Sequence, residues 1–445
     1  MSTQTTLPTQ RFPRRPLLML CVAMLSLIVA IAVRVLYPPQ AQPAKPPAPV
    51  ELSSPTMVNQ LQARLQRTPD DTNAYAQLGL ALLQQVRTTG DVSLYTRAGQ
   101  AFDEALARDP KQLDALIGKG ILALALHDFR GALGWADKAW AINPFRAEIL
   151  GIMVDGQVEL GQYDEAVQTL QKMVDLRPDL NSYSRVSYVR ELHGDVDGAI
   201  EAMHAAVQTA LPGSENWLWT LTHLGHLYFN RGDLKQALEI YEQVLASNQD
   251  YPYALGGMAR VQAAQGRTDE AIALYKQVTE RLPLPEFIIA LGELYESVGQ
   301  MDAANEQYAL VGVIQQLNAS AGMNVDLEMA LFAANHGTDP TAAVAQARAA
   351  YAQRPTLYAA DTLAWALYQQ GEYEEAWHYS QEALYLGTRD AFLYFHAGMI
   401  AQKRGDTATA HTHLQTALEI NPSFSPLYAP IAQQMKDETA PPAGQ

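Results

Sequence analysis

Cysteine is nearly absent from the sequence, because Cys21 is the only one in 445 residues. A single thiol excludes an intrachain disulfide framework and a cysteine metal site. Motifs of catalytic folds are missing as well, since no glycine-rich phosphate loop follows a strand pattern and no G-x-S-x-G serine elbow occurs. We therefore expect no enzymatic activity, no cofactor and no small-molecule substrate.

Acidic residues are absent from residues 1–50, which carry five basic residues. The whole chain has 31 Lys and Arg against 47 Asp and Glu, so the remainder has 26 against 47, or −21. Phosphate binding needs clustered Lys and Arg, so this acidic body argues against nucleic acid. The acidity favours solubility, and attraction of a basic partner is the alternative.

Charged residues are also missing from residues 17–33, and residues 35–37 extend this apolar run beyond Arg34. The length is at the lower limit for crossing a bilayer. We predict a transmembrane signal-anchor helix at residues 17–37. The sequence Ala-Ile-Ala at residues 30–32 keeps a cleaved signal peptide open as the alternative.

The polar segment before this run, residues 1–16, contains Arg11, Arg14 and Arg15. Basic residues that flank a membrane helix tend to stay in the cytoplasm. We therefore predict a single-pass protein of the inner (cytoplasmic) membrane with a cytoplasmic N-terminus. The rest of the chain would then be periplasmic or extracytoplasmic. Residues 38–55 contain seven prolines and are predicted to form an extended linker.

Residues 69–423 repeat one pattern of two short amphipathic helices. A glycine followed five residues later by an alanine marks the turn between the two helices, at Gly161/Ala166, Gly194/Ala199, Gly232/Ala237, Gly266/Ala271, Gly299/Ala304, Gly337/Ala342, Gly371/Ala376 and Gly405/Ala410. A helix ends well in a left-handed turn that glycine adopts without a Cβ clash. A lone hairpin cannot bury both apolar faces, so the copies must stack.

The repeats combine a Leu-Gly pair, an aromatic three residues on, a mid-repeat alanine and a closing proline. Leu224-Gly225, Tyr228 and Ala237 show this pattern in one copy, and Pro283 closes another. With a period near 34 residues, the pattern resembles the tetratricopeptide repeat. The resemblance implies an all-α superhelical solenoid of about ten helix-turn-helix repeats. Residues 56–68 are expected to form a capping helix, and residues 424–445 a final cap helix and tail.

The resemblance also implies a concave groove, lined by side chains of each first helix that point away from the Leu-Gly seam. Carried over residue by residue, these are Tyr188, Trp219, His226, Phe229, Tyr253, Arg260, Glu293, Tyr358, Trp365, Tyr368, Phe392 and Phe395. Large aromatics and arginine anchor interfaces well, so we predict that this groove binds a protein or peptide. A register shifted by one would instead place several of them in the core. The Lys, Asn and Arg positions with which some family members clamp a carboxylate are mostly apolar, aromatic or acidic here.

His223 and His226 are three residues apart and share one face of a predicted helix. Two histidines rarely suffice for a metal site, so we expect groove or core histidines and no metal. The sequence thus predicts a membrane-anchored, non-catalytic scaffold or assembly factor. The alternatives are a cleaved, soluble periplasmic binding protein, or an accessory subunit of a membrane transport or secretion complex.

Overall fold

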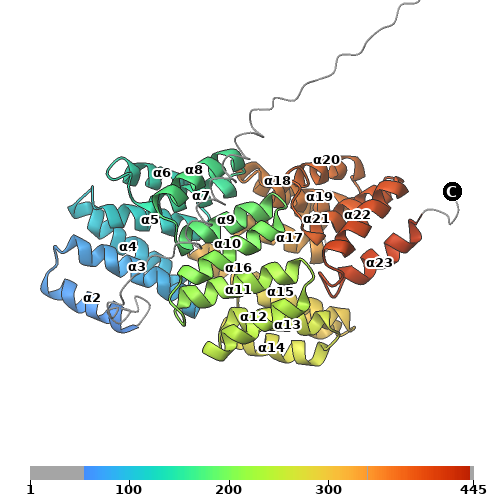
Figure 1. Ribbon diagram of the computed structural model, residues 1–445, viewed down its shortest axis with the longest axis horizontal. Coiled ribbons are helices and arrows are strands. Elements are labelled where there is room, and N and C mark those ends of the chain that lie inside the picture. Colours follow the sequence, from blue (N-terminus) through green and yellow to red (C-terminus); the bar gives the residue numbers. More distant parts are fainter. Residues whose placement is uncertain (1–54, 338, 441–445) are drawn as a thin grey trace, which may run out of the picture. The chain divides into compact units, whose positions relative to one another are not determined.

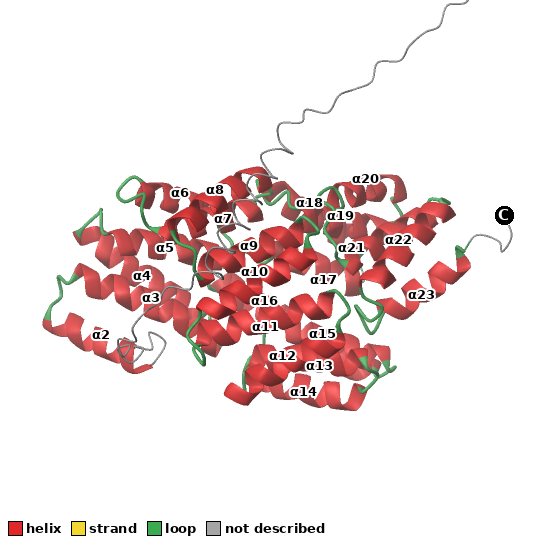
Figure 2. Cartoon of the chain, viewed as in Figure 1, coloured by secondary structure: helices red, strands yellow, loops and turns green. Residues whose placement is uncertain are grey.

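Every repeat predicted from the sequence folds into a pair of antiparallel helices. The computed structural model describes residues 55–337 and 339–440, and these residues form helices and loops without any strand (Figure 2). The membrane span predicted at residues 17–37 lies outside the described residues. Among the helices within them, none has both the length and the apolarity to cross a bilayer.

The described helices follow one another as a terminal helix, ten hairpins and a final helix (Figure 1). The first half comprises α2 (Pro55–Arg67), α3 (Thr72–Thr89), α4 (Ser93–Arg108), α5 (Leu113–Ala125), α6 (Phe129–Trp140), α7 (Ala147–Glu159), α8 (Tyr163–Leu176), α9 (Leu180–Leu192), α10 (Val196–Thr209), α11 (Glu215–Asn230) and α12 (Leu234–Ser247). The second half comprises α13 (Pro252–Ala264), α14 (Thr268–Arg281), α15 (Pro285–Ser297), α16 (Met301–Ser320), α17 (Asp326–His336), α18 (Pro340–Gln353), α19 (Leu357–Gln370), α20 (Tyr373–Ala383), α21 (Ala391–Lys403), α22 (Thr407–Ile420) and α23 (Tyr428–Glu438).

In the α9–α10, α11–α12 and α21–α22 hairpins, the turn is formed by a glycine and an aspartate. Gly232 has φ +82°, a left-handed conformation that ends α11 without a Cβ clash. The Asp233 side chain then accepts a hydrogen bond from the Gln236 amide at 3.1 Å, which caps the free N–H groups at the start of α12. Asp195 and Asp406 cap α10 and α22 in the same way.

The Leu-Gly pair allows neighbouring hairpins to share one large side chain. Tyr241 on α12 is fully buried, and its ring fills the space beside Gly225 on α11 and Gly257 on α13. An added Cβ at either glycine would collide with the ring. Ala237 has no exposed surface, as expected for a close contact between helices. Small residues on first helices therefore make room for an aromatic on the second helix.

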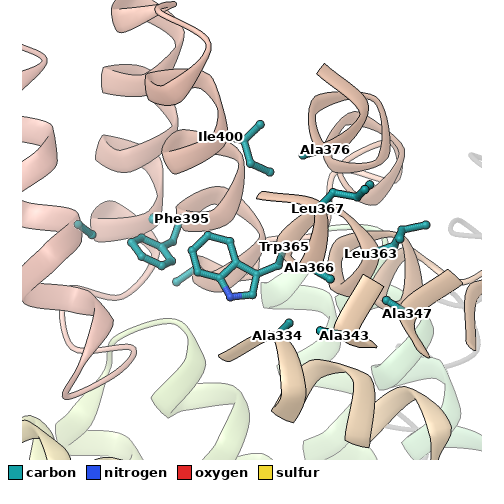
Figure 3. Packing of buried hydrophobic residues seen from close by; sticks show 14 of the residues in the cluster. Ala334, Ala343, Ala347, Leu363, Trp365, Ala366, Leu367, Ala376, Phe395 and Ile400 are labelled. Atoms are coloured by element: carbon teal, nitrogen blue, oxygen red, sulfur yellow. The ribbon is translucent and has the colours of Figure 1, made fainter. Parts of the chain in front are cut away.

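The C-terminal repeats are built around a larger hydrophobic cluster. The Trp365 ring of α19 has Phe395 of α21 on one side and Ala334 of α17 and Ala343 of α18 on the other (Figure 3). Ala334 and Ala347 are among the small residues that let these helices approach. The repeats around Trp365 therefore form one continuous core, as expected for a stacked array.

The turns of the early repeats contact loops that lie between the late repeats. Asn324 donates from its backbone to Leu126 O at 3.0 Å, and the Leu357 amide donates to the Tyr163 hydroxyl at 3.0 Å. The Thr388 hydroxyl donates to Leu192 O, and the Asn421 side chain donates to Phe229 O at 2.8 Å. The side-chain contacts of this series join residues 192–197 positions apart.

We call these four contacts the turn ladder, and each of them is a rung. With a period near 34 residues, a separation of 192–197 is between five and six repeats. Repeats that are five to six positions apart in the array are therefore in contact with each other. Figure 1 shows α9 and α10 beside the helices of the C-terminal half, in agreement with the rung between Leu192 and Thr388.

Candidate binding cavity

A cavity of about 930 Å³ lies between three first helices and the C-terminal end of the array. One wall comes from α11, α13 and α15, the first helices of three successive hairpins. The other wall comes from Leu418 near the end of α22, from residues 422–426 in the link to α23, and from α23 itself. The rung between Phe229 and Asn421 holds these two walls together, so the cavity depends on the closure of the superhelix.

The wall from α11 carries an indole and two imidazoles. Trp219, His223 and His226 share one helical face, with ring centroids 3.9 Å and then 5.4 Å apart. His226 Nδ1 lies 2.7 Å from the Tyr241 hydroxyl. Burial lowers the pKa of His223 to about 4 and that of His226 well below its ordinary value. Both imidazoles are therefore neutral at pH 7, and this wall is uncharged.

Arg260 is the one cation on the cavity surface. Its guanidinium lies over the Phe229 ring at 4.1 Å and donates to Asn230 Oδ1 at 3.4 Å. Within the described part of the chain, Arg260 has no ion pair within 4 Å. A guanidinium has five N–H donors, so most of those of Arg260 are free for a ligand.

Two carboxylates from α15 face the same cavity. Burial raises the pKa of Glu286, and the positive charge of Arg260 opposes that rise. Glu293 Oε1 lies 3.3 Å from His336 Nε2. The cavity thus offers hydrogen-bond donors on one helix and acceptors on the next, between aromatic surfaces. Among the described residues, no three His, Cys, Asp or Glu side chains are grouped so that they could hold a metal ion.

Seven of the twelve residues predicted to line the groove do line this cavity: Trp219, His226, Phe229, Tyr253, Arg260, Glu293 and Phe392. Phe229 lines the cavity although only 3% of its surface is exposed to solvent. Tyr188 and Tyr358 lie outside the cavity. Burial raises the pKa of each hydroxyl, and Tyr188 is among the groups that raise the pKa of Tyr358 further, so the two lie near each other.

Trp365 and Phe395 are not exposed, contrary to the sequence-based expectation. They are 3% and 1% exposed and belong to the core of the C-terminal repeats. The Trp365 indole donates to Asn335 Oδ1 at 2.8 Å, and its ring stacks on Tyr368 at 4.6 Å and on His396 at 4.2 Å. The alanines of α17 and α19 bring neighbouring helices so close that side chains at this register are enclosed between them.

The wall from residues 418–433 was missed by the sequence interpretation. Phe424, Pro426 and Pro430 line the cavity opposite Arg260, although about 160 residues separate them in the chain. The motif Asn-Pro-Ser-Phe-Ser-Pro at residues 421–426 is the available signal, because it places an aromatic between two prolines after the last repeat. The motif alone does not predict which helices it packs against.

Comparison with known proteins identifies the repeated unit. Tetratricopeptide-repeat models match residues 91–147, 228–290 and 356–389, and a PPR-repeat model matches residues 149–177. The chain therefore contains tetratricopeptide repeats, as the resemblance predicted. These matches cover α4 to α8, α12 to α14 and the α19–α20 hairpin.

Two curated relatives share part of this repeat region. Tetratricopeptide repeat protein 13 of Homo sapiens is 27% identical over 163 residues, which are 36% of this chain and 18% of the relative. Protein CTR9 homolog of Arabidopsis thaliana is 25% identical over 207 residues, which are 44% of this chain and 19% of the relative. The chain thus spans less than a fifth of the length of either relative.

Solved structures match the chain at low sequence identity. The Cut9–Hcn1 hetero-tetramer of the APC/C matches with 16% identity and a TM-score of 0.33, over 86% of this chain and 92% of that one. YrrB, described as a tetratricopeptide-repeat protein with an unusual peptide-binding site, matches with 20% identity and a TM-score of 0.28. That match covers 44% of this chain and 97% of YrrB.

Proposed function

We propose that this chain is a non-catalytic scaffold or assembly factor that binds a protein or peptide partner in the cavity beside α11, α13 and α15. The observation that carries the proposal is the composition of that cavity. It combines the aromatic rings of Trp219, Tyr253 and Phe392 with the guanidinium of Arg260, which lies over the Phe229 ring and donates one hydrogen bond to Asn230. Aromatic and arginine side chains in a concave site are the residues that contribute most to binding energy at interfaces.

We further propose that residues 17–37 anchor the chain in the inner membrane and that the repeats lie in the periplasm or another extracytoplasmic space. The uncharged run and the preceding Arg11, Arg14 and Arg15 support this placement. A cleaved, soluble periplasmic binder is the competing arrangement. Determination of the N-terminus of the mature protein, with membrane fractionation, distinguishes them: loss of about the first 32 residues would remove the anchor.

The binding proposal is tested by photo-crosslinking in cells, followed by mass spectrometry. A double variant, Trp219→Ala with Tyr253→Ala, removes two aromatic rings of the cavity. Phe145→Ala is the matched control, because Phe145 is 78% exposed and lies outside the cavity. We expect partners that are lost from the double variant and retained by the control. Identical partner lists for wild type and double variant would reject the cavity as the binding site.

Two measurements make this comparison sharper. Thermal unfolding of each variant separates loss of binding from loss of fold, because Trp219 packs on His223 at 3.9 Å. Co-purification of a variant without residues 1–37 tests the accessory-subunit alternative. If partners require the N-terminal segment and ignore the cavity substitutions, the chain acts as a subunit held through its anchor.

A further inference from the structure

We infer that a second copy of this chain binds head to tail and extends the turn ladder, so that loops of its first half lie on turn glycines of the late repeats. The inference goes beyond the proposed function, because it concerns the turns and loops of the repeats and does not depend on what the cavity binds. Three features of the array support it: the register of the ladder, motifs shared by its loops, and a half-hairpin at each end.

The turn ladder keeps one register. Each rung joins the turn inside one hairpin to the loop that follows the fifth hairpin after it, as Leu126 of the α5–α6 turn meets Asn324 of the α16–α17 loop. Gly90, in the α3–α4 turn, lies against Leu282 of the α14–α15 loop in the same register. The turn at Gly266 and the later turns would need loops beyond the tenth hairpin, and the described residues contain none.

Turns without a loop and loops without a turn therefore occur in the same chain. The free turns are those of Gly266, Gly299, Gly371 and Gly405, where an added Cβ would have no neighbour within 4 Å. The early loops are those that follow α6, α8 and α10, and no turn glycine of the described residues lies against them. Two copies in one continuous register would supply each with the other.

One loop that lies on a turn has a copy among the early loops. Residues 420–422 and 142–144 both have the sequence Ile-Asn-Pro. The first segment lies against the Gly232 turn, and Ile420 is 5% exposed. In the second segment, Ile142 is 40% exposed. A motif that forms a rung is therefore present a second time on the surface.

The Leu-Pro motif shows the same contrast. It occurs at residues 282–283 and again at residues 211–212. Leu282 lies against Gly90 and is 2% exposed, whereas Leu211 is 49% exposed in the α10–α11 loop. Burial of an exposed leucine side chain is favourable, so a turn of another copy offers Leu211 the kind of site that Leu282 already occupies.

A third motif, Arg-Pro-x-Leu, occurs at residues 354–357 and 177–180. The first segment lies on the Gly161 turn, where Arg354 forms an ion pair with Glu159. The second segment is the α8–α9 loop, where Arg177 is exposed. Each of the three motifs thus occurs once on a turn and once in an early loop.

The ends of the array are complementary half-hairpins. α2 packs on α3 as a second helix packs on the first helix of the next hairpin, and α23 packs on α22 as a first helix packs on the preceding second helix. No described helix completes either hairpin, and α23 exposes Ile431 at 40%. α23 of one copy and α2 of the next can therefore form an eleventh hairpin, which continues the register across the junction.

With that junction, the free turns receive the early loops in order. Gly371 meets the α8–α9 loop of the next copy, and Gly405 meets its α10–α11 loop. Arg177 then comes beside Glu372, which has the opposite charge and follows Gly371. A head-to-tail contact between identical chains continues into a ring or a filament. The net charge of −16 opposes association, so salt should strengthen it.

The test mixes two single-cysteine variants of the full chain in detergent solution, each with its own tag and a Cys21→Ser background. One variant carries Leu211→Cys in an early loop, and the other carries Thr407→Cys beside the Gly405 turn. A bis-maleimide reports contacts between the chains. We expect at least about tenfold more crosslinked dimer in the mixture than with either variant alone, and more at high salt than at low salt.

Sedimentation velocity of the full chain gives a second measurement. Leu176→Asp with Leu211→Asp places charges in two early loops and should weaken self-association by about tenfold or more. Leu310→Asp with Leu317→Asp is the matched control, because both side chains are exposed on α16 and lie away from the Gly299 turn. It should change self-association by less than about twofold. Thermal unfolding checks that both double variants keep the fold.

Three results would overturn the inference. The first is a chain that sediments as a single copy at high salt and gives no crosslinked dimer in the mixture. The second is an equal yield of dimer from either variant alone, which would show that like surfaces meet. The third is equal self-association of the two double variants, which would exclude the early loops. Loss of a cavity-bound partner from the Trp219→Ala, Tyr253→Ala variant is measured separately, so the two proposals can fail independently.

Discussion

The turn glycines of the early and the late repeats share one sequence pattern and one backbone conformation, but their surroundings differ. Gly161, Gly194 and Gly232 have φ between +71° and +82°, and each meets the backbone of a segment from a later repeat. Gly266, Gly299, Gly371 and Gly405 have φ between +75° and +92°. For these four, an added Cβ would have no neighbour within 4 Å.

The difference separates two roles of the same residue. In the late repeats, glycine is needed only because its φ is positive. In the early repeats, it is needed also because another backbone lies against it, and this contact closes the superhelix. A substitution that is compatible with the hairpin can therefore still be incompatible with closure, and the two groups of turns provide matched pairs for testing this.

The largest effect is expected for Gly194→Ala compared with Gly371→Ala. Both introduce the strain of a left-handed alanine, about 1–2 kcal/mol. Gly194→Ala also places a methyl group against Gly387 O, which should cost about 1–3 kcal/mol more. Urea unfolding of the two variants measures the difference in the free energy of unfolding. Equal destabilisation would mean that the Gly194 turn is as free as the Gly371 turn.

A smaller effect is expected when a single hydrogen bond of the turn ladder is removed. Asn421 and Asn248 both follow the last residue of a second helix, and each side chain accepts a backbone hydrogen bond two residues on. Only Asn421 also donates to Phe229 O. Asn421→Ala should therefore cost about 1.5 kcal/mol more than Asn248→Ala, because it removes one hydrogen bond from the Phe229 carbonyl, which keeps only the bond from the Gly232 amide.

Thermal and urea unfolding of the two asparagine variants check this difference. Amide hydrogen exchange gives a second measurement, since loss of the rung should increase exchange at the start of α23 and leave α3 unchanged. Unaltered exchange near α23 together with equal stability would contradict a closed rung at residues 229–421.

Tyr163→Phe compared with Tyr373→Phe removes one hydroxyl from the same position of two repeats. Both tyrosines follow the turn glycine by two residues and begin a second helix. Tyr163 is buried and accepts from the Leu357 amide, whereas Tyr373 is half-buried. We expect Tyr163→Phe to cost about 1 kcal/mol more than Tyr373→Phe in the free energy of unfolding. No difference would show that water replaces the hydroxyl at Leu357.

The sequence predicts the parts of this fold that depend on neighbours in the chain. The turn at Gly232, the capping aspartate after it and the buried Ala237 all follow from the spacing within one repeat. The position of the cavity wall on α11 and α13 follows from the same register, because residues such as Trp219 and Arg260 occupy equivalent faces of successive first helices.

The sequence does not predict closure, because the two sides of each rung are 192–197 residues apart and carry no matching signal. Gly194 and Gly371 are indistinguishable by local pattern. The enclosed position of Trp365 has the same origin: the distance between α17, α19 and α21 is set by alanines on all three helices, and one helix alone does not reveal it. Residues 418–433 form a cavity wall only because the superhelix brings the end of the array against α11, α13 and α15.

The smallest expected effect concerns Glu191, which ends the first helix just before the Gly194 turn. Burial, with a smaller contribution from the charge of Asp390, raises the pKa of this carboxyl from its ordinary 4.5 to about 7, and a hydrogen bond from Asn230 opposes the rise. The folded chain therefore holds a proton that the unfolded chain releases near pH 4.5. Stability from this group is complete below pH 4.5 and is lost as the pH rises to about 7.

Glu191→Gln removes the titration, so its unfolding midpoint should fall less between pH 5 and pH 7 than that of the wild type. Glu201→Gln, on the exposed side of α10, is the control and should follow the wild type. Urea midpoints at several pH values in this window give the slopes. The rung between Leu192 and Thr388 excludes water from the end of α9, so an open rung would restore hydration to Glu191. Parallel slopes for wild type and Glu191→Gln would therefore argue that this turn, like that of Gly371, faces solvent.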